Sequence, residues 1–404
     1  ADAVLVNTCG FIESAKTEAI ENILEACSYK QANPELKVVV TGCLAERYRS
    51  QIAQEIPEVD AVVGCASNGA IAAILDRLTA GEQHLESYGP KRDFPLGGKR
   101  VIGTPAHYAY LKIAEGCNNR CHYCAIPGIR GPLRSRDMAD CLAEARWLAG
   151  EGVKELIVVA QDPTAYGEDW GKPGSLCELL DGLNAIPGIE WVRIMYAYPE
   201  RITDQLIQTM QRDEKVLPYL DLPIQHCSDE VLHRMNRRST KAQLLDVIRR
   251  LREAIPGITL RTTLIAGFPG ETEEQFEELC QFVKDVQFDR LGCFAYSAEE
   301  NTVAAGMDGQ LDQETKDRRA ELVMQIQTGI MAQKQAAKVG QTVRVLCDGV
   351  DDESGLYLCR TAADAPEVDG NVCVSSEEPL YPGEFYDVLV DDSDLYDLYG
   401  TVVK

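Results

Sequence analysis

Six apolar runs, each followed by a segment of helical length, are the feature that most constrains the fold of this 404-residue chain. The runs are Tyr108–Ala114, Leu156–Ala160, Trp191–Met195, Tyr219–Leu222, Ile258–Ala266 and Arg290–Ala295. Buried strands that alternate with helices are typical of a parallel sheet, and repeated units of this kind close into a barrel. Because there are six units and not eight, the sequence predicts a partial (βα)6 barrel.

The regions on either side of these units have different patterns. Residues 1–80 alternate short strands with helices, which indicates a parallel α/β domain, and residues 86–105 are rich in Gly, Pro and Lys, as a linker is. Residues 340–404 hold short apolar runs separated by Gly, Pro and Asp, which predicts a small antiparallel β-barrel. We therefore expect an α/β multidomain protein with domains at 1–90, 105–336 and 339–404.

Composition limits the class of protein and its setting. No apolar run approaches the ~18–20 residues that span a bilayer, so an integral membrane protein is excluded. Fifteen cysteines, an odd number, are scattered along the chain, and we expect no signal peptide, which argues against a secreted disulfide framework. The sequence therefore predicts a reducing, cytoplasmic location, where thiols are available to bind metals.

Three of these cysteines form a compact motif directly after the first run of the predicted barrel. Cys117, Cys121 and Cys124 have the spacing C-x3-C-x2-C. Thiolates select iron–sulfur clusters or zinc, and a structural zinc site usually has four ligands. A cubane cluster with three protein ligands leaves one iron open for substrate chemistry. The alternatives are a zinc site that uses His122, or three buried thiols.

Two more cysteines each follow a predicted strand in the N-terminal region. They stand in Asn7-Thr8-Cys9-Gly10 and in Thr41-Gly42-Cys43-Leu44-Ala45. The carboxyl ends of parallel strands meet at one edge of a sheet, so Cys9 and Cys43 are expected to converge there as metal ligands. The alternative is that both are small buried hydrophobic residues. The other cysteines, Cys65 among them, lack ligand spacing and are interpreted as ordinary.

The cysteine motif at the end of a first barrel strand resembles the radical S-adenosylmethionine superfamily. The resemblance implies a [4Fe–4S] cluster whose open iron binds S-adenosylmethionine and cleaves it reductively to a 5'-deoxyadenosyl radical. It also places Tyr123 against the adenine, although Tyr123 could instead shield the cluster. Arg130, Arg134 and Arg136 follow the motif and could neutralise cluster or cofactor charge, but Arg130 also suits a solvated loop.

Further cofactor contacts are expected at the carboxyl ends of the predicted strands, where barrel enzymes place functional groups. Gln161 ends the second strand, and the segment Ile265–Thr272 carries Gly267, Gly270 and Glu271. The two glycines allow the backbone to approach a ligand closely, but they also suit a plain strand-to-helix turn.

The order of all these motifs along the chain resembles the methylthiotransferases. That family has a second [4Fe–4S] cluster, bound by three cysteines, of which Cys9 and Cys43 match the second and third. The first would lie upstream of Ala1, and the chain opens straight into a strand, so we expect it to lack a first strand and helix and to hold the second cluster incompletely. S-adenosylmethionine and two clusters are the cofactors implied.

Two branches of the family compete, one acting on adenosine in tRNA and one on the β-carbon of an aspartate in ribosomal protein S twelve. The segments Asn7–Ile12, Ala160–Gly167 and Leu222–His226 resemble the second branch. Residues 340–404, which resemble a TRAM domain, hold three Lys or Arg and fifteen Asp or Glu, a net charge of −12. Such a surface repels RNA and attracts a basic protein.

The predicted partners are therefore the ribosomal protein and, by resemblance, an electron donor such as flavodoxin, with no membrane and with tRNA disfavoured. A function of another class, a non-catalytic iron–sulfur carrier, is also disfavoured. A carrier does not need a cofactor-sized barrel beside an open iron.

Overall fold

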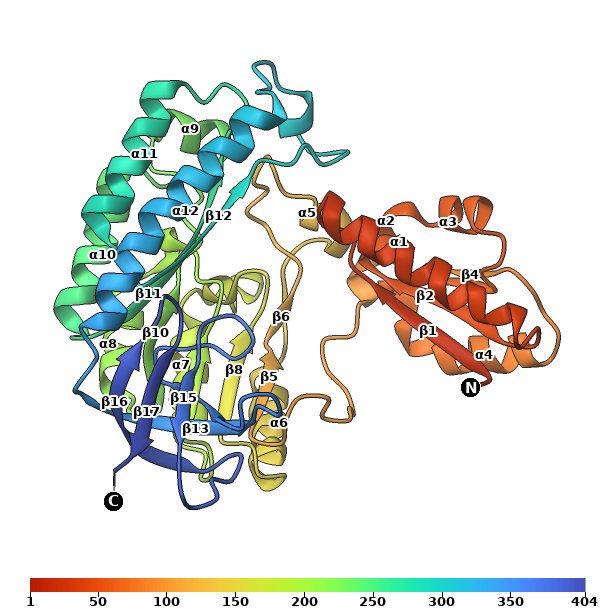
Figure 1. Ribbon diagram of the computed structural model, residues 1–404. Helices are drawn as coiled ribbons and strands as arrows, with labels where there is room; N and C mark the ends of the chain where they lie inside the picture. Colours follow the sequence, from red (N-terminus) through yellow and green to blue (C-terminus); the bar gives the residue numbers. More distant parts are fainter. Residues whose placement is uncertain (404) are drawn as a thin grey trace. The chain divides into compact units, whose positions relative to one another are not determined.

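The structure is a computed structural model that describes residues 1–403. The chain forms two compact units, and most of their helices and strands are labelled in Figure 1. The first unit comprises Ala1–Gly98, Glu115–Arg134 and Ser297–Met307, and the second comprises Lys99–Ala114, Ser135–Tyr296 and the chain from Asp308 onward. Among the described residues, no helix is both long enough and apolar enough to cross a membrane.

The first unit is built on a four-stranded parallel sheet with the strand order β1-β2-β3-β4. Its strands are β1 (Ala3–Thr8), β2 (Lys37–Gly42), β3 (Ala61–Gly64) and β4 (Leu85–Ser87). Its helices are α1 (Glu13–Ser28), α2 (Cys43–Tyr48), α3 (Ser50–Glu55), α4 (Ile71–Thr79) and α5 (Ile126–Arg130), with 3-10 turns at Tyr29–Gln31, Cys65–Ala70, Lys91–Asp93 and Ala304–Gly306.

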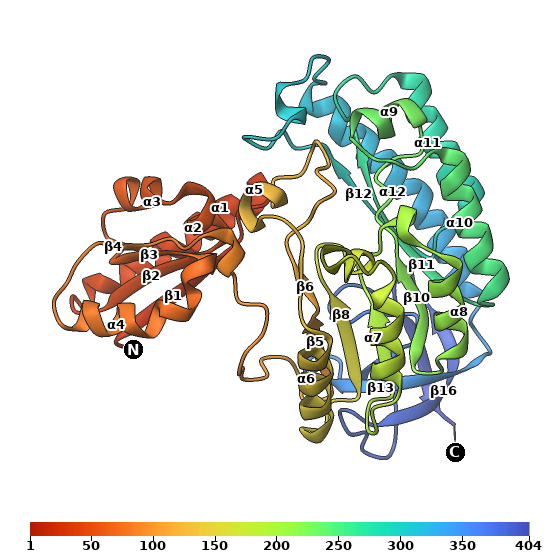
Figure 2. The same cartoon turned by 180° about the vertical axis from the view of Figure 1, so that it is seen from behind.

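Alternate side chains along β2 point to opposite faces of this sheet and pack into two separate cores. Val40 packs with Ile23 of α1 in a core that α2 and α3 also join, whereas Val39 packs with Leu78 of α4 on the other face. Figure 2 shows α4 across the sheet from α1. The predicted parallel α/β arrangement is confirmed. The strand β4 lies partly in the predicted linker and was not anticipated.

The second unit contains the six predicted parallel strands in one sheet, in the order β12-β11-β10-β9-β8-β5. They are β5 (Tyr108–Lys112), β8 (Glu155–Val159), β9 (Trp191–Ile194), β10 (Val216–Asp221), β11 (Thr259–Ala266) and β12 (Arg290–Ala295). The predicted partial barrel of six strands is therefore confirmed. A short ribbon of β6 (Ala114–Glu115) and β7 (Arg134–Ser135) flanks the cysteine segment.

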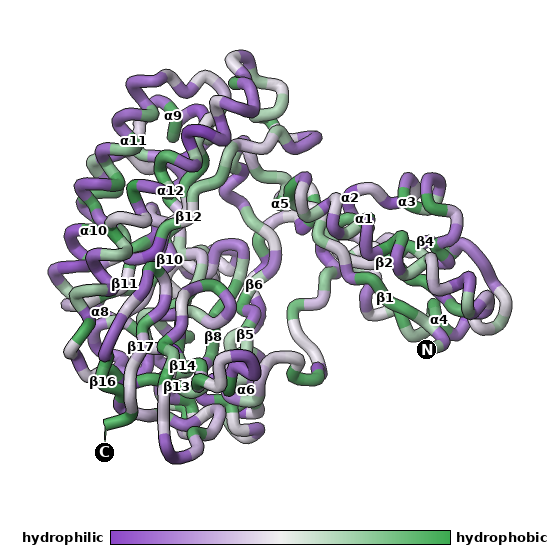
Figure 3. The backbone as a smooth tube through the Cα atoms, in the orientation of Figure 1, coloured by the Kyte–Doolittle hydropathy of each residue, from purple (hydrophilic) through white to green (hydrophobic). Residues whose placement is uncertain are grey.

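Helices follow the strands of this sheet, as the alternating pattern predicts. They are α6 (Met138–Gly150), α7 (Ser175–Asn184), α8 (Asp204–Arg212), α9 (Asp229–Arg234), α10 (Lys241–Ala254), α11 (Glu273–Val286) and α12 (Gln313–Ala336), with 3-10 turns at Pro163–Ala165, Glu168–Trp170 and Pro199–Arg201. Figure 3 shows hydrophobic and hydrophilic residues interspersed along α10 and α11, as expected of helices with one buried face. A capping box of Thr272 and Gln275 starts α11.

The C-terminal strands close a small barrel in the order β13-β14-β15-β17-β16. They are β13 (Thr342–Val350), β14 (Tyr357–Thr361), β15 (Val372–Ser375), β16 (Phe385–Ser393) and β17 (Leu398–Val402). Most pairs are antiparallel, as predicted, but β15 and β17 pair in parallel, with Val372 opposite Leu398. The barrel is therefore closed by strands that are not neighbours in the sequence.

This small barrel packs against the amino-terminal ends of the six-stranded sheet, within the second unit. Tyr108 and Trp191, the first residues of β5 and β9, share a buried cluster with Leu346 of the barrel, and Trp191 meets Phe385 edge-on at 5.0 Å between ring centroids. One end of the sheet is thereby covered. The carboxyl ends of the strands, where the candidate residues lie, are at the opposite end.

Candidate functional site

The first unit brings Cys9 and Cys43 to neighbouring positions at the carboxyl edge of its sheet. Thr8, the last residue of β1, pairs with Gly42, the last residue of β2, so the two cysteines leave the sheet side by side. The two strand ends are in close contact, since a Cβ added to Gly10 would lie only 2.7 Å from the backbone nitrogen of Leu44. Cys9 is exposed and Cys43 is half-buried.

Cys65 extends this arrangement into a row of three thiols. Gly42 pairs with Gly64 at the end of β3, so Cys65 follows β3 as Cys43 follows β2. The Cys65 side chain is buried, and its thiol is close enough to that of Cys43 to lower the Cys43 pKa. The sequence interpretation treated Cys65 as ordinary. The signal that was overlooked is the repeated strand–Gly–Cys ending of β2 and β3.

Arg130 contacts Cys43 from the far end of α5. Its Nη2 donates a hydrogen bond to the Cys43 sulfur over 3.1 Å, and its Nη1 forms an ion pair with Glu115 over 3.2 Å. The guanidinium also lies over the ring of Phe94, 5.7 Å from its centroid. Of the two environments considered for Arg130, the solvated loop is wrong, because these partners hold the guanidinium in place.

Because of these contacts, the negative charge of the Cys43–Cys65 pair lies on Cys43. The hydrogen bond from Cys65 and the charge of Arg130 lower the pKa of Cys43 to about 6, although burial acts in the opposite direction. The pKa of Cys65 is raised, because its thiol donates to Cys43 and is buried. The guanidinium lies against Cys43, which fixes the negative charge there.

The segment with Cys117, Cys121 and Cys124 also belongs to the first unit. A tight turn shapes it: Gly116 has φ +79°, and a Cβ there would lie 2.1 Å from the Pro132 carbonyl oxygen, so only glycine fits. Burial raises the pKa of Cys124 to about 12, and the neighbouring Cys121 and Cys117 thiols add to the effect. The three thiols are therefore close enough to interact.

The thiol sets suit iron–sulfur clusters better than a single metal ion. None of the fifteen cysteines is in a disulfide. Within residues 1–403, no three His, Cys, Asp or Glu side chains surround one point at which an ion could bind. A cubane does not require this convergence, because each thiolate binds a different iron. Three thiolates at the C-x3-C-x2-C spacing are the donor set of a cubane cluster with one open iron.

In the second unit, the loop after β11 is held in a rigid turn by Glu271. Both Gly267 and Gly270 have φ +74°, a conformation that favours glycine. The Gly267 N–H donates to both carboxylate oxygens of Glu271, at 3.0 and 3.1 Å, and Arg319 donates to the same carboxylate over 2.7 Å. The Glu271 carboxylate is therefore already hydrogen-bonded to the loop and to Arg319.

The charge state of Glu271 follows from its partners. Burial alone raises the pKa of this carboxyl group, but His226, the Gly267 N–H and Arg319 outweigh it, so the pKa lies below its ordinary value. His226 Nδ1 accepts from the Ser228 N–H over 3.0 Å, so the ring proton is on Nε2, which lies 3.3 Å from Glu271. An ionised Glu271 therefore keeps the two glycines in their turn.

Gln161 follows β8 at the same edge of the six-stranded sheet. Its Oε1 atom is buried and has no hydrogen-bond partner in the protein. An unsatisfied buried amide oxygen is costly, and a ligand that donates a hydrogen bond would relieve the cost. The next residue, Asp162, accepts from Arg201 over 3.0 Å and also bonds Thr164, so it is already engaged.

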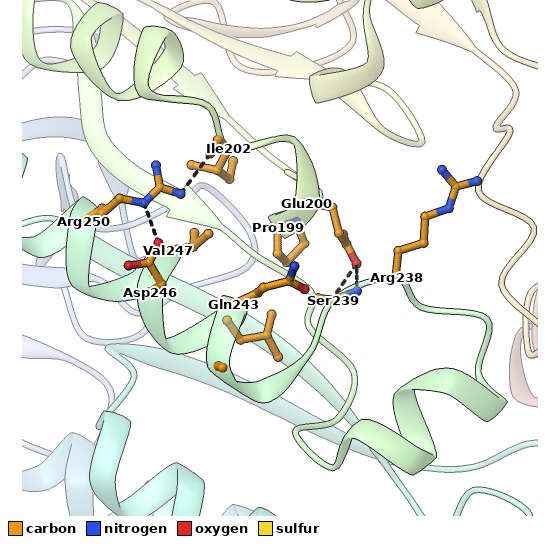
Figure 4. Close-up of a pocket in the computed structure, with 11 residues that line it drawn as sticks. Pro199, Glu200, Ile202, Arg238, Ser239, Gln243, Asp246, Val247 and Arg250 are labelled. Atoms are coloured by element: carbon orange, nitrogen blue, oxygen red, sulfur yellow. Dashed lines mark hydrogen bonds and ion pairs between the residues drawn. The ribbon is translucent and has the colours of Figure 1, made fainter.

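A separate cavity of about 520 Å³ lies beside the start of α10 and contains none of the predicted site residues. Figure 4 shows Glu200 hydrogen-bonded to Ser239 in this cavity and Arg250 paired with Asp246. Asp246, Arg250 and Glu200 thus have hydrogen-bond partners within the cavity lining. The cavity is not the site that the sequence indicates.

Comparison with known proteins relates all three regions of the chain to described families. The family model "Radical SAM superfamily" matches residues 111–283, "TRAM domain" matches 339–403, and "Uncharacterized protein family UPF0004" matches 1–64. The chain is 46% identical over 412 residues to "Ribosomal protein uS12 methylthiotransferase RimO" of Acetivibrio thermocellus, covering 100% of this chain and 90% of that protein. It is 45% identical to the protein of the same name from Clostridioides difficile, covering 100% and 90%.

A solved structure also resembles the chain, at low sequence identity. The radical S-adenosylmethionine methyltransferase TsrM from Kitasatospora setae aligns with a TM-score of 0.55 and 13% identity, over 72% of this chain and 61% of that one. At this identity the likeness concerns the fold alone.

Proposed function

The chain belongs to the RimO family of ribosomal protein uS12 methylthiotransferases, and from this premise we propose that it methylthiolates the β-carbon of an aspartate in uS12. The observation that carries the proposal is the 46% identity along the whole chain, combined with two separate thiol sets in the first unit. One set has the spacing of a cluster with an open iron. The other set, Cys9 and Cys43, follows the ends of the two paired strands β1 and β2.

Cys117, Cys121 and Cys124 are proposed to hold the cluster that binds S-adenosylmethionine. When bound, this cluster and cofactor supply the radical that removes a hydrogen atom from the substrate carbon. The protein residues bind and orient the cluster and the cofactor. Cys9 and Cys43 are proposed as ligands of a second cluster that handles sulfur, and their paired positions at the ends of β1 and β2 support this role.

The carboxyl edge of the six-stranded sheet supplies proposed contacts to S-adenosylmethionine. Gly267 and Gly270 expose backbone there, and the buried Gln161 oxygen offers an acceptor. Glu271 acts by holding the glycine turn, because its carboxylate already bonds Gly267 and Arg319. Tyr123, inside the cysteine segment, is proposed as a contact for the adenine.

The small barrel is proposed to dock on the basic substrate protein. Ten of its acidic side chains are exposed: Asp352, Glu353, Glu367, Glu377, Glu378, Glu384, Asp387, Asp391, Asp392 and Asp394. Of its two described basic residues, Arg360 is buried among carboxylates and only Arg344 is exposed. A surface of this charge attracts a basic protein and repels RNA.

The barrel's aromatic residues divide between core and surface. Phe385 packs on Trp191, whereas Tyr381 and Tyr396 are 63% and 50% exposed and are available as contact anchors. The acidic surface disfavours the tRNA branch of the methylthiotransferases. A non-catalytic carrier would have no need of the six-stranded sheet with its glycine turn.

The test is mass spectrometry of uS12 after incubation with the reconstituted enzyme, S-adenosylmethionine and a reductant in the absence of oxygen. We expect a methylthio group on one aspartate, and a mass increase confined to tRNA would contradict the proposal. We further propose that the reaction takes place in the cytoplasm and that a small redox protein of the flavodoxin type supplies the electrons. Replacing the chemical reductant by reduced flavodoxin tests the electron donor.

A further inference from the structure

We propose that Arg130 and Cys65 are positioning residues that donate hydrogen bonds to the Cys43 sulfur and thereby raise the reduction potential of the cluster bound there. The inference rests on the proposed role of Cys43 as a cluster ligand. It assigns functions to two side chains for which neither the motif spacing nor the family comparison gives a role.

Other contacts hold the Arg130 guanidinium in the position from which it donates to Cys43. The donor Nη2 lies 3.1 Å from the Cys43 sulfur, while Nη1 is held by Glu115, whose side chain is 1% exposed. The ring of Phe94 supports the guanidinium from a third direction. Because the planar guanidinium is fixed through its other nitrogen and its face, little conformational freedom remains to be lost in donating to the sulfur.

Cys65 reaches the same sulfur from the neighbouring strand. The register of Gly42 with Gly64 places the two cysteines side by side, and the Cys65 side chain is 3% exposed. A thiol donates one proton. With Arg130 against Cys43, the sulfur of Cys43 is the acceptor and Cys65 the donor.

Donors to a cluster-bound sulfur stabilise the more negative, reduced form of the cluster, which raises its potential. Arg130 adds a full positive charge next to a thiolate, so its contribution has the same sign as that of the Cys65 thiol. Removing either donor therefore shifts the potential to a more negative value and leaves the cluster in place.

Arg130 also links the two thiol sets of the first unit. It ends α5, six residues after Cys124, in the segment that carries the three motif cysteines. The segment proposed to hold one cluster thus supplies a hydrogen bond to a ligand of the other. A movement of α5 would change the potential at Cys43.

The test uses the intact protein with Cys117, Cys121 and Cys124 replaced by Ala, so that only the second cluster contributes iron and a paramagnetic signal. In this background Arg130→Met and Cys65→Ala are compared with the parent by iron analysis and by redox titration followed by electron paramagnetic resonance. We expect unchanged iron and a potential more negative by about 59 mV for Arg130→Met, which is a tenfold change for one electron.

Conservative variants and controls distinguish donation from packing. Arg130→Lys and Cys65→Ser retain a donor and are expected to restore most of the potential. Arg134→Met is the matched arginine control, because Arg134 in the same segment donates to the carbonyl oxygens of Arg92 and Phe94 and not to sulfur. Cys27→Ala is the matched cysteine control, because Cys27 is buried in the core beside α1.

Three results would overturn the inference. An unchanged potential in both donor variants would show that the hydrogen bonds have no electrostatic effect. Loss of iron in Cys65→Ala would show that Cys65 is itself a ligand. If the parent holds no iron, or Cys9→Ala and Cys43→Ala leave its iron unchanged, the proposed ligands of the second cluster are wrong, and the inference fails with them.

Discussion

Arg360 of the small barrel and Glu155 at the start of β8 form a buried ion pair, 2.7 Å apart, between residues separated by 205 positions in the sequence. The second Glu155 oxygen accepts from Arg193, also over 2.7 Å, and Arg360 donates to Asp348 over 2.6 Å. His107 completes the network through Asp348. One connected set of charges therefore joins the barrel to the six-stranded sheet.

Arg360→Met is expected to destabilise the second unit strongly. It leaves Asp348 without its arginine and Glu155 with Arg193 alone, and breaking a buried ion pair on one side typically costs ~3–5 kcal/mol. Denaturant unfolding followed by tryptophan fluorescence measures the change. Arg344→Met is the control, because Arg344 is exposed and should contribute less than about 1 kcal/mol. Equal losses in the two variants would contradict the buried network.

Acid should weaken the same interface. Burial alone raises the pKa of Asp348, but His107 and Arg360 outweigh it, so its pKa is lower when folded than when unfolded. The stability that Asp348 contributes is therefore complete above its unfolded pKa and is lost as pH falls below about 4. Thermal unfolding between pH 3 and 7 should show a smaller pH dependence in Asp348→Asn. If the stability of Asp348→Asn depends on pH just as that of the parent does, Asp348 does not contribute to the pH dependence.

The two cysteine sets should be separable by activity. Cys117→Ala removes a ligand of the proposed S-adenosylmethionine cluster, so formation of 5'-deoxyadenosine should stop. The double variant Cys9→Ala, Cys43→Ala should still cleave the cofactor but transfer no sulfur to uS12. Chromatography of the nucleoside and mass spectrometry of the protein measure the two steps. Undiminished nucleoside formation by Cys117→Ala would refute its assignment.

A side chain at Gly270, in the turn after β11, should strain the backbone and displace the Arg234 side chain. A Cβ at Gly270 would lie 2.0 Å from the Arg234 guanidinium, in addition to the strain of its positive φ. Gly257 has a similar φ, +78°, but open space around it, so Gly257→Ala should cost only about 1–2 kcal/mol. We expect Gly270→Ala to lower stability and to raise the KM for S-adenosylmethionine. An unchanged KM would argue that this loop does not contact the cofactor.

Reversing charge on the small barrel should weaken capture of uS12. Asp387, Asp391 and Asp392 are exposed and are suitable for replacement by Lys. Asp394 is best kept, because it accepts from the Tyr396 N–H over 2.8 Å and caps a turn. Surface plasmon resonance should show weaker binding, and binding to the parent should fall as salt rises.

A variant with the same change in charge elsewhere is the control for this prediction. Glu277, Asp285 and Glu321 are exposed on α11 and α12, and their replacement by Lys changes the net charge equally. Capture should remain near the level of the parent. If both triple variants lose binding equally, total charge and not the barrel surface governs association.

The strands that could be predicted were those buried on both faces. A parallel strand covered on both faces is mostly apolar, so β8 was found close to its observed bounds. β4 has three residues, Leu-Glu-Ser, and no apolar run, so it resembled a linker. The parallel pairing of β15 with β17 depends on closure of the barrel, which no local pattern encodes.

The site residues divide in a similar way. Ligand spacing predicts Cys117, Cys121 and Cys124 as cluster ligands, because the whole pattern lies within eight residues. Cys65 was overlooked because a lone buried cysteine resembles any small hydrophobic residue, and only the register of β2 with β3 brings it to Cys43. The contact of Arg130 with Cys43 joins residues 87 positions apart, beyond any sequence period.

The long separation between Glu155 and Arg360 has a consequence for synthesis on the ribosome. Strands β8 and β9 emerge first, carrying Glu155 and Arg193, while the arginine that completes their network is about two hundred codons from translation. Until the last strands close, the base of the nascent sheet exposes apolar surface that the small barrel later covers. The base of the six-stranded sheet can therefore be buried only after the strands of the small barrel have been translated.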